Sequence, residues 1–98
     1  MKINYEVKIT EEAQVELDQI LQHYQTKGGD QLADTVAARI TDDILIFEGS
    51  PRVGKKYKRH EQRVFPIYGG RYIVAYILDE KNAIVHIIAI KSIIGSTL

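Results

Sequence analysis

Positively charged side chains that could act on phosphates are concentrated in one short stretch of this sequence. Seven Lys and Arg residues fall within 20 residues, with Glu61 as the only acidic residue among them. Such a cluster can bind nucleic-acid phosphates, stabilise the charge that develops on phosphorus during RNA cleavage, or contact an acidic protein surface. Tyr57 in the same stretch could stack on a base, and His60 titrates near neutral pH. The seven cations are Arg52, Lys55, Lys56, Lys58, Arg59, Arg63 and Arg71.

Other catalytic chemistry has little support in the residue types. The chain has no cysteine, which excludes thiolate catalysis, disulfides and zinc sites built on cysteine. The three histidines are far apart in the sequence, so we expect no metal site, and we also expect no cofactor. RNA cleavage further needs groups that transfer protons. Lys91 lies near the end of the chain, but residues 92–98 contain no tyrosine, histidine or acidic residue.

Charge is divided along the chain, although the formal net charge is zero. Residues 1–48 hold 4 Lys and Arg against 10 Asp and Glu, which gives a net charge of −6 (4 − 10). Residues 49–98 hold 9 against 3, which gives +6 (9 − 3). We therefore expect one positive patch at the mouth of the sheet, with the acidic residues of the first half facing away from it.

The first half of the chain predicts a strand followed by two helices. Residues 3–9 alternate between apolar and polar side chains, as in a strand with one buried face. Thr10 suits a helix N-cap, and an apolar stripe follows it at helical spacing. Gly28-Gly29 would end this helix, and Asp30 could cap a second one. Two helices with so short a break predict an antiparallel hairpin that lies on something flat.

The second half predicts three strands, which form that flat partner. They cover residues 63–68, 71–78 and 83–90, and residues 52–62 are the one long connection. Pro66 cannot donate a backbone hydrogen bond, so its strand should lie at an edge or contain a bulge. The last strand is almost wholly apolar and should be central. The predicted fold class is α+β, in the order β-α-α-β-β-β, with a helical hairpin packed on one face of a small, mainly antiparallel four-stranded sheet.

The length and composition indicate one ordinary globular domain. The chain has 98 residues, 45% hydrophobic and 27% charged, so we expect a single domain over residues 1–98. No apolar run approaches the roughly 18 residues that span a bilayer, and the secretory pattern of a basic start, an apolar run and a cleavage site is missing. We expect no membrane partner and a cytoplasmic location.

Three stretches, in this order of elements, resemble the RelE/ParE superfamily of bacterial toxins from type II toxin–antitoxin systems. They are residues 5–13, residues 49–58, with their Ser-Pro and Gly-Lys-rich loop, and residues 63–81, with a tyrosine-containing middle strand. The resemblance implies a plasmid-stabilisation type of toxin that inhibits bacterial growth. It also implies a cognate antitoxin as partner, and it leaves a homodimer or a toxin–antitoxin hetero-oligomer open.

The superfamily has two modes of action, and the resemblance implies different residues for each. RelE-like members cut mRNA on the ribosome, which would use Lys56, Lys58, Arg63 and Lys91 without a metal. ParE-like members bind and poison DNA gyrase, for which the target-binding residues would be Arg52, Lys55, Tyr57, Arg59 and Arg71.

The ParE-like mode is the better match to the rest of the sequence. The tail has no aromatic or histidine group for proton transfer, and Ile73 stands where the tyrosine–arginine pair of the family would place arginine. The RelE-like endonuclease remains the alternative. A further alternative is an inactive interaction module of the same fold, which would have no effect on growth.

Overall fold

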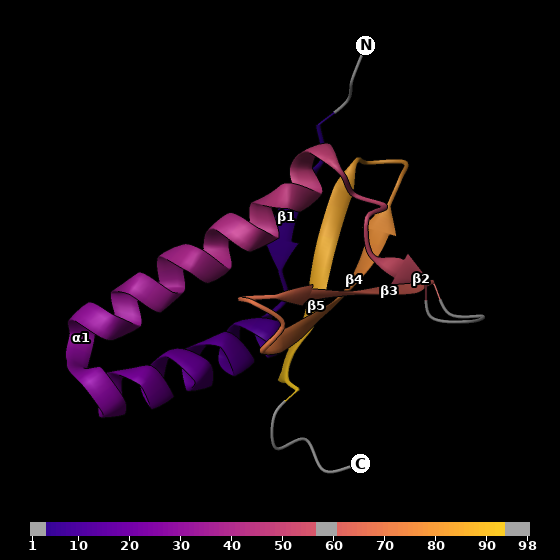
Figure 1. Cartoon of the computed structure of the whole chain (residues 1–98). Coiled ribbons are helices and arrows are strands. Elements are labelled where there is room, and N and C mark those ends of the chain that lie inside the picture. The colour runs from indigo at the N-terminus through magenta and orange to yellow at the C-terminus, as the bar shows by residue number, and fades with distance from the viewer. Residues whose placement is uncertain (1–3, 57–60, 94–98) are drawn as a thin grey trace.

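The computed structural model describes residues 4–56 and 61–93, and its elements follow the predicted order with one addition (Figure 1). A long bent helix packs on one side of a strongly twisted sheet. The elements are β1 (Glu6–Ile9), α1 (Glu11–Gly49), β2 (Lys55–Lys56), β3 (Gln62–Ile67), β4 (Tyr72–Asp79) and β5 (Ile84–Ser92).

The helical hairpin is confirmed, and its bend lies where the glycine pair predicted it. The side chain of Thr10 accepts a hydrogen bond from the backbone N–H of Ala13 at 3.2 Å, so it caps the helix as expected. Gly29 has φ 79° and ψ −173°, a combination that is nearly restricted to glycine. The helix resumes at once after Gly29, so the two halves of α1 meet at a sharp bend and need no loop between them (Figure 1).

The sheet has five strands in the order β1-β5-β4-β3-β2, so the predicted number of four is wrong. The additional strand is β2, which pairs Lys55 with Val64 and Lys56 with Arg63 inside the predicted long connection. Three of the pairings are antiparallel, and β1 runs parallel to β5. The α+β class and the mainly antiparallel sheet are confirmed, and β5 is an inner strand between β1 and β4, although β4 holds the centre.

The edge position of Pro66 follows from the shortness of β2. Because β2 pairs only with Arg63 and Val64, Pro66 lies on the part of β3 that has no neighbour beyond it. The turn that follows is longer than the two predicted glycines. Tyr68, Gly69 and Gly70 all have positive φ, at 51°, 63° and 81°, and β4 begins only at Tyr72.

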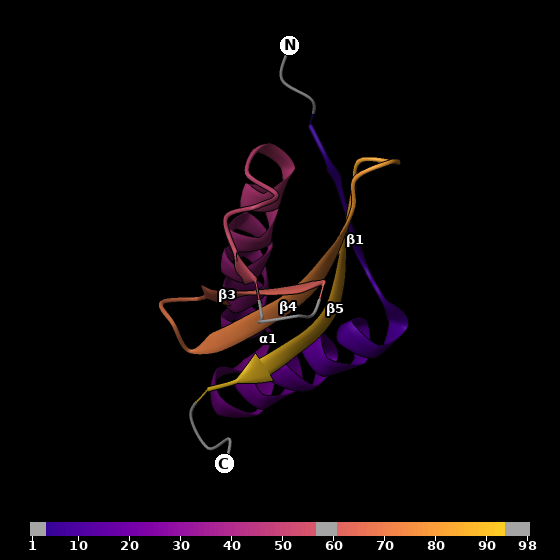
Figure 2. The same cartoon turned by 90° about the vertical axis from the view of Figure 1, so that its right-hand side faces the viewer.

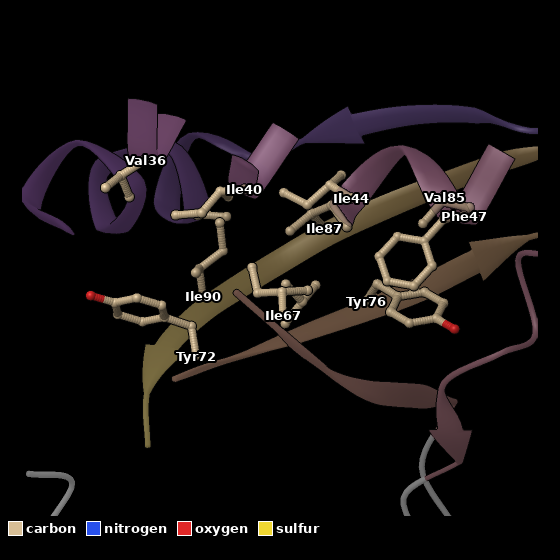
Figure 3. Packing of buried hydrophobic residues seen from close by; sticks show 12 residues of the cluster. Val36, Ile40, Ile44, Phe47, Ile67, Tyr72, Tyr76, Val85, Ile87 and Ile90 are labelled. Atoms are coloured by element: carbon tan, nitrogen blue, oxygen red, sulfur yellow. The ribbon is translucent and has the colours of Figure 1, made fainter. Parts of the chain in front are cut away.

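The hydrophobic core fills the space between α1 and the inner face of the sheet (Figure 3). Phe47 on the helix packs on Tyr76 of β4, with ring centroids 4.3 Å apart, and both side chains are fully buried. Burying a side chain of this size stabilises the fold by roughly 1.5–3 kcal/mol. Figure 3 shows the hydroxyls of Tyr72 and Tyr76 at opposite ends of the core. The two tyrosines share parity on one strand, which predicts from the sequence that both pack in the core, and this is confirmed.

The outer face of the sheet is also apolar, and neither half of α1 covers it (Figures 1 and 2). Side chains alternate between the two faces, so the residues between the core positions of each strand point outwards. None of these apolar residues belongs to the core cluster, and most are half-buried. We call them the outer patch: Val64, Ile73, Ala75, Ile77, Ile84 and Ala89.

Candidate functional site

The start of the basic connection is tied to the core by the hydroxyl of Tyr76. This hydroxyl donates to the carbonyl oxygen of Pro51 at 2.8 Å and accepts from the N–H of Gly54 at 2.8 Å. Burial raises the pKa of Tyr76, and this effect is larger than the lowering of the pKa by the Gly54 N–H and by Arg63. The hydroxyl therefore remains protonated at neutral pH and holds both sides of the loop.

Arg63 binds the same loop from β3. Its Nη1 donates to the carbonyl oxygen of Gly54 at 2.8 Å and to that of Arg52 at 3.3 Å. Because Arg63 lies opposite Tyr76 in the sheet register, both side chains reach the loop from the inner face. The predicted catalytic guanidinium thus fixes the backbone of the segment that carries the other cations.

The remaining described cations of the connection differ in their surroundings. Arg52 forms an ion pair with Glu80 in the β4–β5 turn, and it also lies 3.4 Å from the Tyr5 hydroxyl. The hydrogen bond to Glu80 is the main reason that the pKa of Arg52 is raised. Lys55 and Lys56 are exposed on β2, and the register places Lys55 next to the outer patch, opposite Val64.

Lys91 lies far from the other predicted catalytic residues. It sits opposite Ile73, three residues along β4 from Tyr76, the partner of Arg63. Lys91 is therefore about 10 Å from Arg63 along the strand direction, and the two residues lie on strands at opposite sides of β4. The ammonium of Lys91 pairs with Glu16 of α1, whose other oxygen accepts from the N–H of Ile90 at 2.9 Å. Within the described residues, Lys56 and Arg63 are therefore neighbours and Lys91 is not.

The expectation of one positive patch is wrong for Arg71. This residue precedes β4 and is five residues from Tyr76, which places it about 17 Å along the sheet from Arg63. Its guanidinium lies 5.5 Å from the centre of the Tyr68 ring. Arg39 of α1 lies 5.3 Å from the same ring. The sequence did not single out Arg39, because it stands in the acidic half and only the fold brings it to the turn.

Four other residues of interest, Tyr57, Lys58, Arg59 and His60, lie outside the described residues. Their predicted roles stay predictions. Of the nine predicted site residues, the structure thus places Arg52, Lys55, Lys56 and Arg63 around one loop, and it places Arg71 and Lys91 elsewhere.

The outer patch offers a binding surface with few side chains that could take part in catalysis. Lys8 on β1 and Lys55 on β2 flank it, and His86 lies within it opposite Ile77. Asp79 closes one end; hydrogen bonds from the side chain and backbone of Asn82 lower its pKa. An apolar surface with cations at its margins suits contact with another protein.

The described residues hold neither a metal-binding cluster nor a helix suited to a membrane. Residues 4–56 and 61–93 contain no group of three or more histidine, aspartate or glutamate side chains arranged to hold a metal ion. In the same residues, no helix has the length and apolar character that a bilayer crossing requires.

Solved structures confirm the fold. The chromosomal ParDE toxin–antitoxin system from P. aeruginosa contains a chain with 17% identity and a TM-score of 0.78, over 90% of this chain and 95% of that one. The RelBE2 toxin–antitoxin complex from Mycobacterium tuberculosis gives 20% identity and a TM-score of 0.60, over 92% and 99%. A mutant of the E. coli toxin RelE in its free state has 16% identity and a TM-score of 0.61, over 96% of this chain and 88% of that one.

The sequence itself identifies the family. A comparison with curated proteins found no match. The model of the family described as the ParE toxin of the type II toxin–antitoxin system parDE, however, matches residues 7–92, which include both halves of α1, the strands β2 to β5 and all of β1 except Glu6. The chain therefore belongs to the ParE toxin family of type II toxin–antitoxin systems.

Proposed function

We propose that this toxin acts by binding and inhibiting DNA gyrase, and that it cleaves no RNA itself. The observation that carries this proposal is the composition of the outer patch. The patch carries apolar side chains on three neighbouring strands, and His86 is the one described histidine on this face. Such a surface can bind a protein. Of its described titratable groups, Asp79 is already hydrogen-bonded to Asn82, whereas cleavage by a 2′-hydroxyl requires an acid and a base that are both free to act on the RNA.

The positions of the cations support the same mode. Cleavage needs positive groups that converge on one phosphate. Arg63 instead donates to two loop carbonyls, and Lys91 pairs with Glu16 at the other end of the sheet. Lys56 and Lys58 would remain as the cations of an endonuclease, without a described partner for proton transfer.

The target-binding residues would lie at the β2 side of the outer patch. Lys55 borders the patch directly, and Arg52 lies in the loop before it. Tyr57 and Arg59 belong to the same connection and would extend this margin. Arg71 would contribute only to a second contact, because it lies at the other end of the sheet. Acidic residues of the target would complement the exposed lysine.

We further propose a cognate antitoxin as partner. The similar structures from P. aeruginosa and M. tuberculosis are toxin–antitoxin assemblies by their descriptions, and family membership places this chain on the toxin side of such a pair. Co-expression with the product of a short neighbouring gene should restore growth that the toxin alone inhibits.

A supercoiling assay with purified gyrase tests the target. The protein should inhibit supercoiling, and Ile77→Glu should weaken this inhibition at least tenfold, because it replaces an apolar residue of the outer patch with a charged one. Ile77→Val keeps the surface apolar and serves as the matched control. Thermal unfolding of both variants checks that the fold is retained.

The alternative makes the opposite prediction. A RelE-like endonuclease would cut ribosome-bound mRNA, would leave supercoiling unchanged, and would lose activity in Arg63→Ala. Cleaved message together with undisturbed supercoiling at excess protein would overturn the gyrase proposal. Normal growth on induction without antitoxin would favour the inactive interaction module.

A further inference from the structure

A small pocket between the bend of α1 and the β3–β4 turn has a lining that is cationic and contains no carboxylate. The pocket has a volume of about 280 Å³. Two of its side chains carry fixed positive charges, one is a histidine, and three bear hydroxyl groups. The lining residues are His23, Tyr24, Lys27, Arg71, Tyr72 and Ser92. We call this space the hairpin-tip pocket.

Two tyrosines of the hairpin-tip pocket are joined by their hydroxyls. The Tyr72 hydroxyl donates to the Tyr24 hydroxyl at 3.0 Å. Since Tyr24 accepts this hydrogen bond, its own hydrogen can donate to a ligand. Burial, followed by the bond to Tyr24, raises the pKa of Tyr72, so this hydroxyl stays protonated at neutral pH. The ring of His23 meets that of Tyr24 edge-on at 5.3 Å, and His23 is exposed.

The guanidinium of Arg71 lies against a strained aromatic residue. Tyr68 has φ 51°, which costs roughly 1–2 kcal/mol in a residue other than glycine. Its N–H donates to a carboxylate oxygen of Asp43 at 2.7 Å, which holds the turn in this conformation. The Tyr68 ring contacts both Arg71 and Arg39. A strained residue whose ring contacts a cation of the pocket, Arg71, favours a binding role for this end of the molecule.

The acidic side chain of the adjoining groove is already engaged. A larger groove of about 440 Å³ adjoins the pocket and shares His23, Tyr72 and Ser92 with it. Its carboxylate is Glu16, which binds the Ile90 N–H with one oxygen and Lys91 with the other. No carboxylate in the described lining is therefore left to neutralise the two cations of the hairpin-tip pocket.

We propose that the hairpin-tip pocket binds the phosphate group of a small ligand. Lys27 and Arg71 would neutralise the charge, and the Tyr24 hydroxyl would donate to a phosphate oxygen. A phosphate monoester carries about −1.5 to −2 charges at neutral pH, which matches two fixed cations better than a single carboxylate does. The adjoining groove would receive the rest of the ligand. The pocket shares no residue with the outer patch, so the inference is independent of that surface, and Arg71 is the one residue that the proposed gyrase contact also uses.

An NMR titration of the full chain with inorganic phosphate tests this proposal, at constant ionic strength and with chloride as reference. The backbone amides of residues 23–27 and 71–72 should shift in a saturable way. Lys27→Gln and Arg71→Gln should each weaken binding at least tenfold. Lys81→Gln removes an exposed lysine in the β4–β5 turn, at the opposite end of β4, and should leave binding unchanged.

Two further ligands test which chemical groups the hairpin-tip pocket recognises. A nucleoside monophosphate should bind at least as tightly as inorganic phosphate, and tighter binding would show that the adjoining groove contributes. Citrate should bind more weakly than phosphate. The proposal is overturned if phosphate gives no saturable shifts, if citrate binds equally well, or if Lys81→Gln weakens binding as much as Arg71→Gln does.

Discussion

At the scale of single residues, the loop that carries the cations depends on one hydroxyl. Tyr76 joins the core, through its contact with Phe47, to the loop, through Pro51 and Gly54. The sequence predicted that Tyr76 would be buried, because it shares strand parity with Tyr72. It could not predict the partners of the hydroxyl, since they lie more than 20 residues away in the chain.

Removing that hydroxyl should destabilise the protein without leaving a large cavity. Tyr76→Phe would leave a buried N–H and a buried carbonyl without their partner, at a cost of about 1–3 kcal/mol in the free energy of unfolding. Urea unfolding measures the change. Tyr5→Phe is the control, because the Tyr5 hydroxyl has only a long contact with Arg52. Equal stability of the two variants would show that the loop is held in another way.

The close approach of Gly54 to Tyr76 gives a second prediction. A Cβ atom at position 54 would lie 2.5 Å from Oη, 2.7 Å from Cε1 and 2.9 Å from Cζ of Tyr76. Because that ring is fully buried and packed against Phe47, Gly54→Ala should cost about 1–3 kcal/mol in unfolding free energy. Gly49→Ala is the matched control, since a Cβ there meets nothing within 4 Å. A Gly54→Ala variant as stable as wild type would contradict the packing described.

At the scale of elements, local signals in the sequence predicted the helices and the three longer strands. Alternation, the Thr10 cap and the glycine pair each act over a few residues, so they can be read without the rest of the chain. The strand β2 has no such signal. Two lysines form it only because β3 offers them an edge to pair with, and this pairing is a tertiary interaction.

The bend of α1 has a glycine requirement that can be tested. Gly29→Ala meets no atom within 4 Å, so any loss of stability must come from the backbone. With φ 79° and ψ −173° the substitution should cost about 1–3 kcal/mol, or else straighten the bend. Thermal unfolding and the NMR spectrum would report the two effects. Unchanged stability with an unchanged spectrum would contradict the conformation at this position.

At the scale of the whole molecule, the charge count along the chain predicted that acidic and basic residues are separated, but it did not predict where the basic residues lie in the fold. The sheet register separates Arg71 from Arg63, and the bend of α1 brings Lys27 of the acidic half to the same pocket as Arg71. Two cationic regions at opposite ends of the sheet result. The sequence could not show this, because residues that are close in the sequence lie far apart in space when they stand at the two ends of one extended strand.

The two buried tyrosines should make the whole fold sensitive to alkali. Burial raises the pKa of both Tyr72 and Tyr76 in the folded state, while in the unfolded chain both ionise near pH 10. Their contribution to stability is therefore complete below about pH 10 and is lost as the pH rises towards their folded pKa values. Unfolding by urea at several pH values should show constant stability up to about pH 10 and a steep fall above it. Tyrosinate absorbance should then appear in two steps, with the later step coinciding with unfolding. One step for all six tyrosines, with stability retained, would contradict this account, because it would require ionised hydroxyls at both ends of the core.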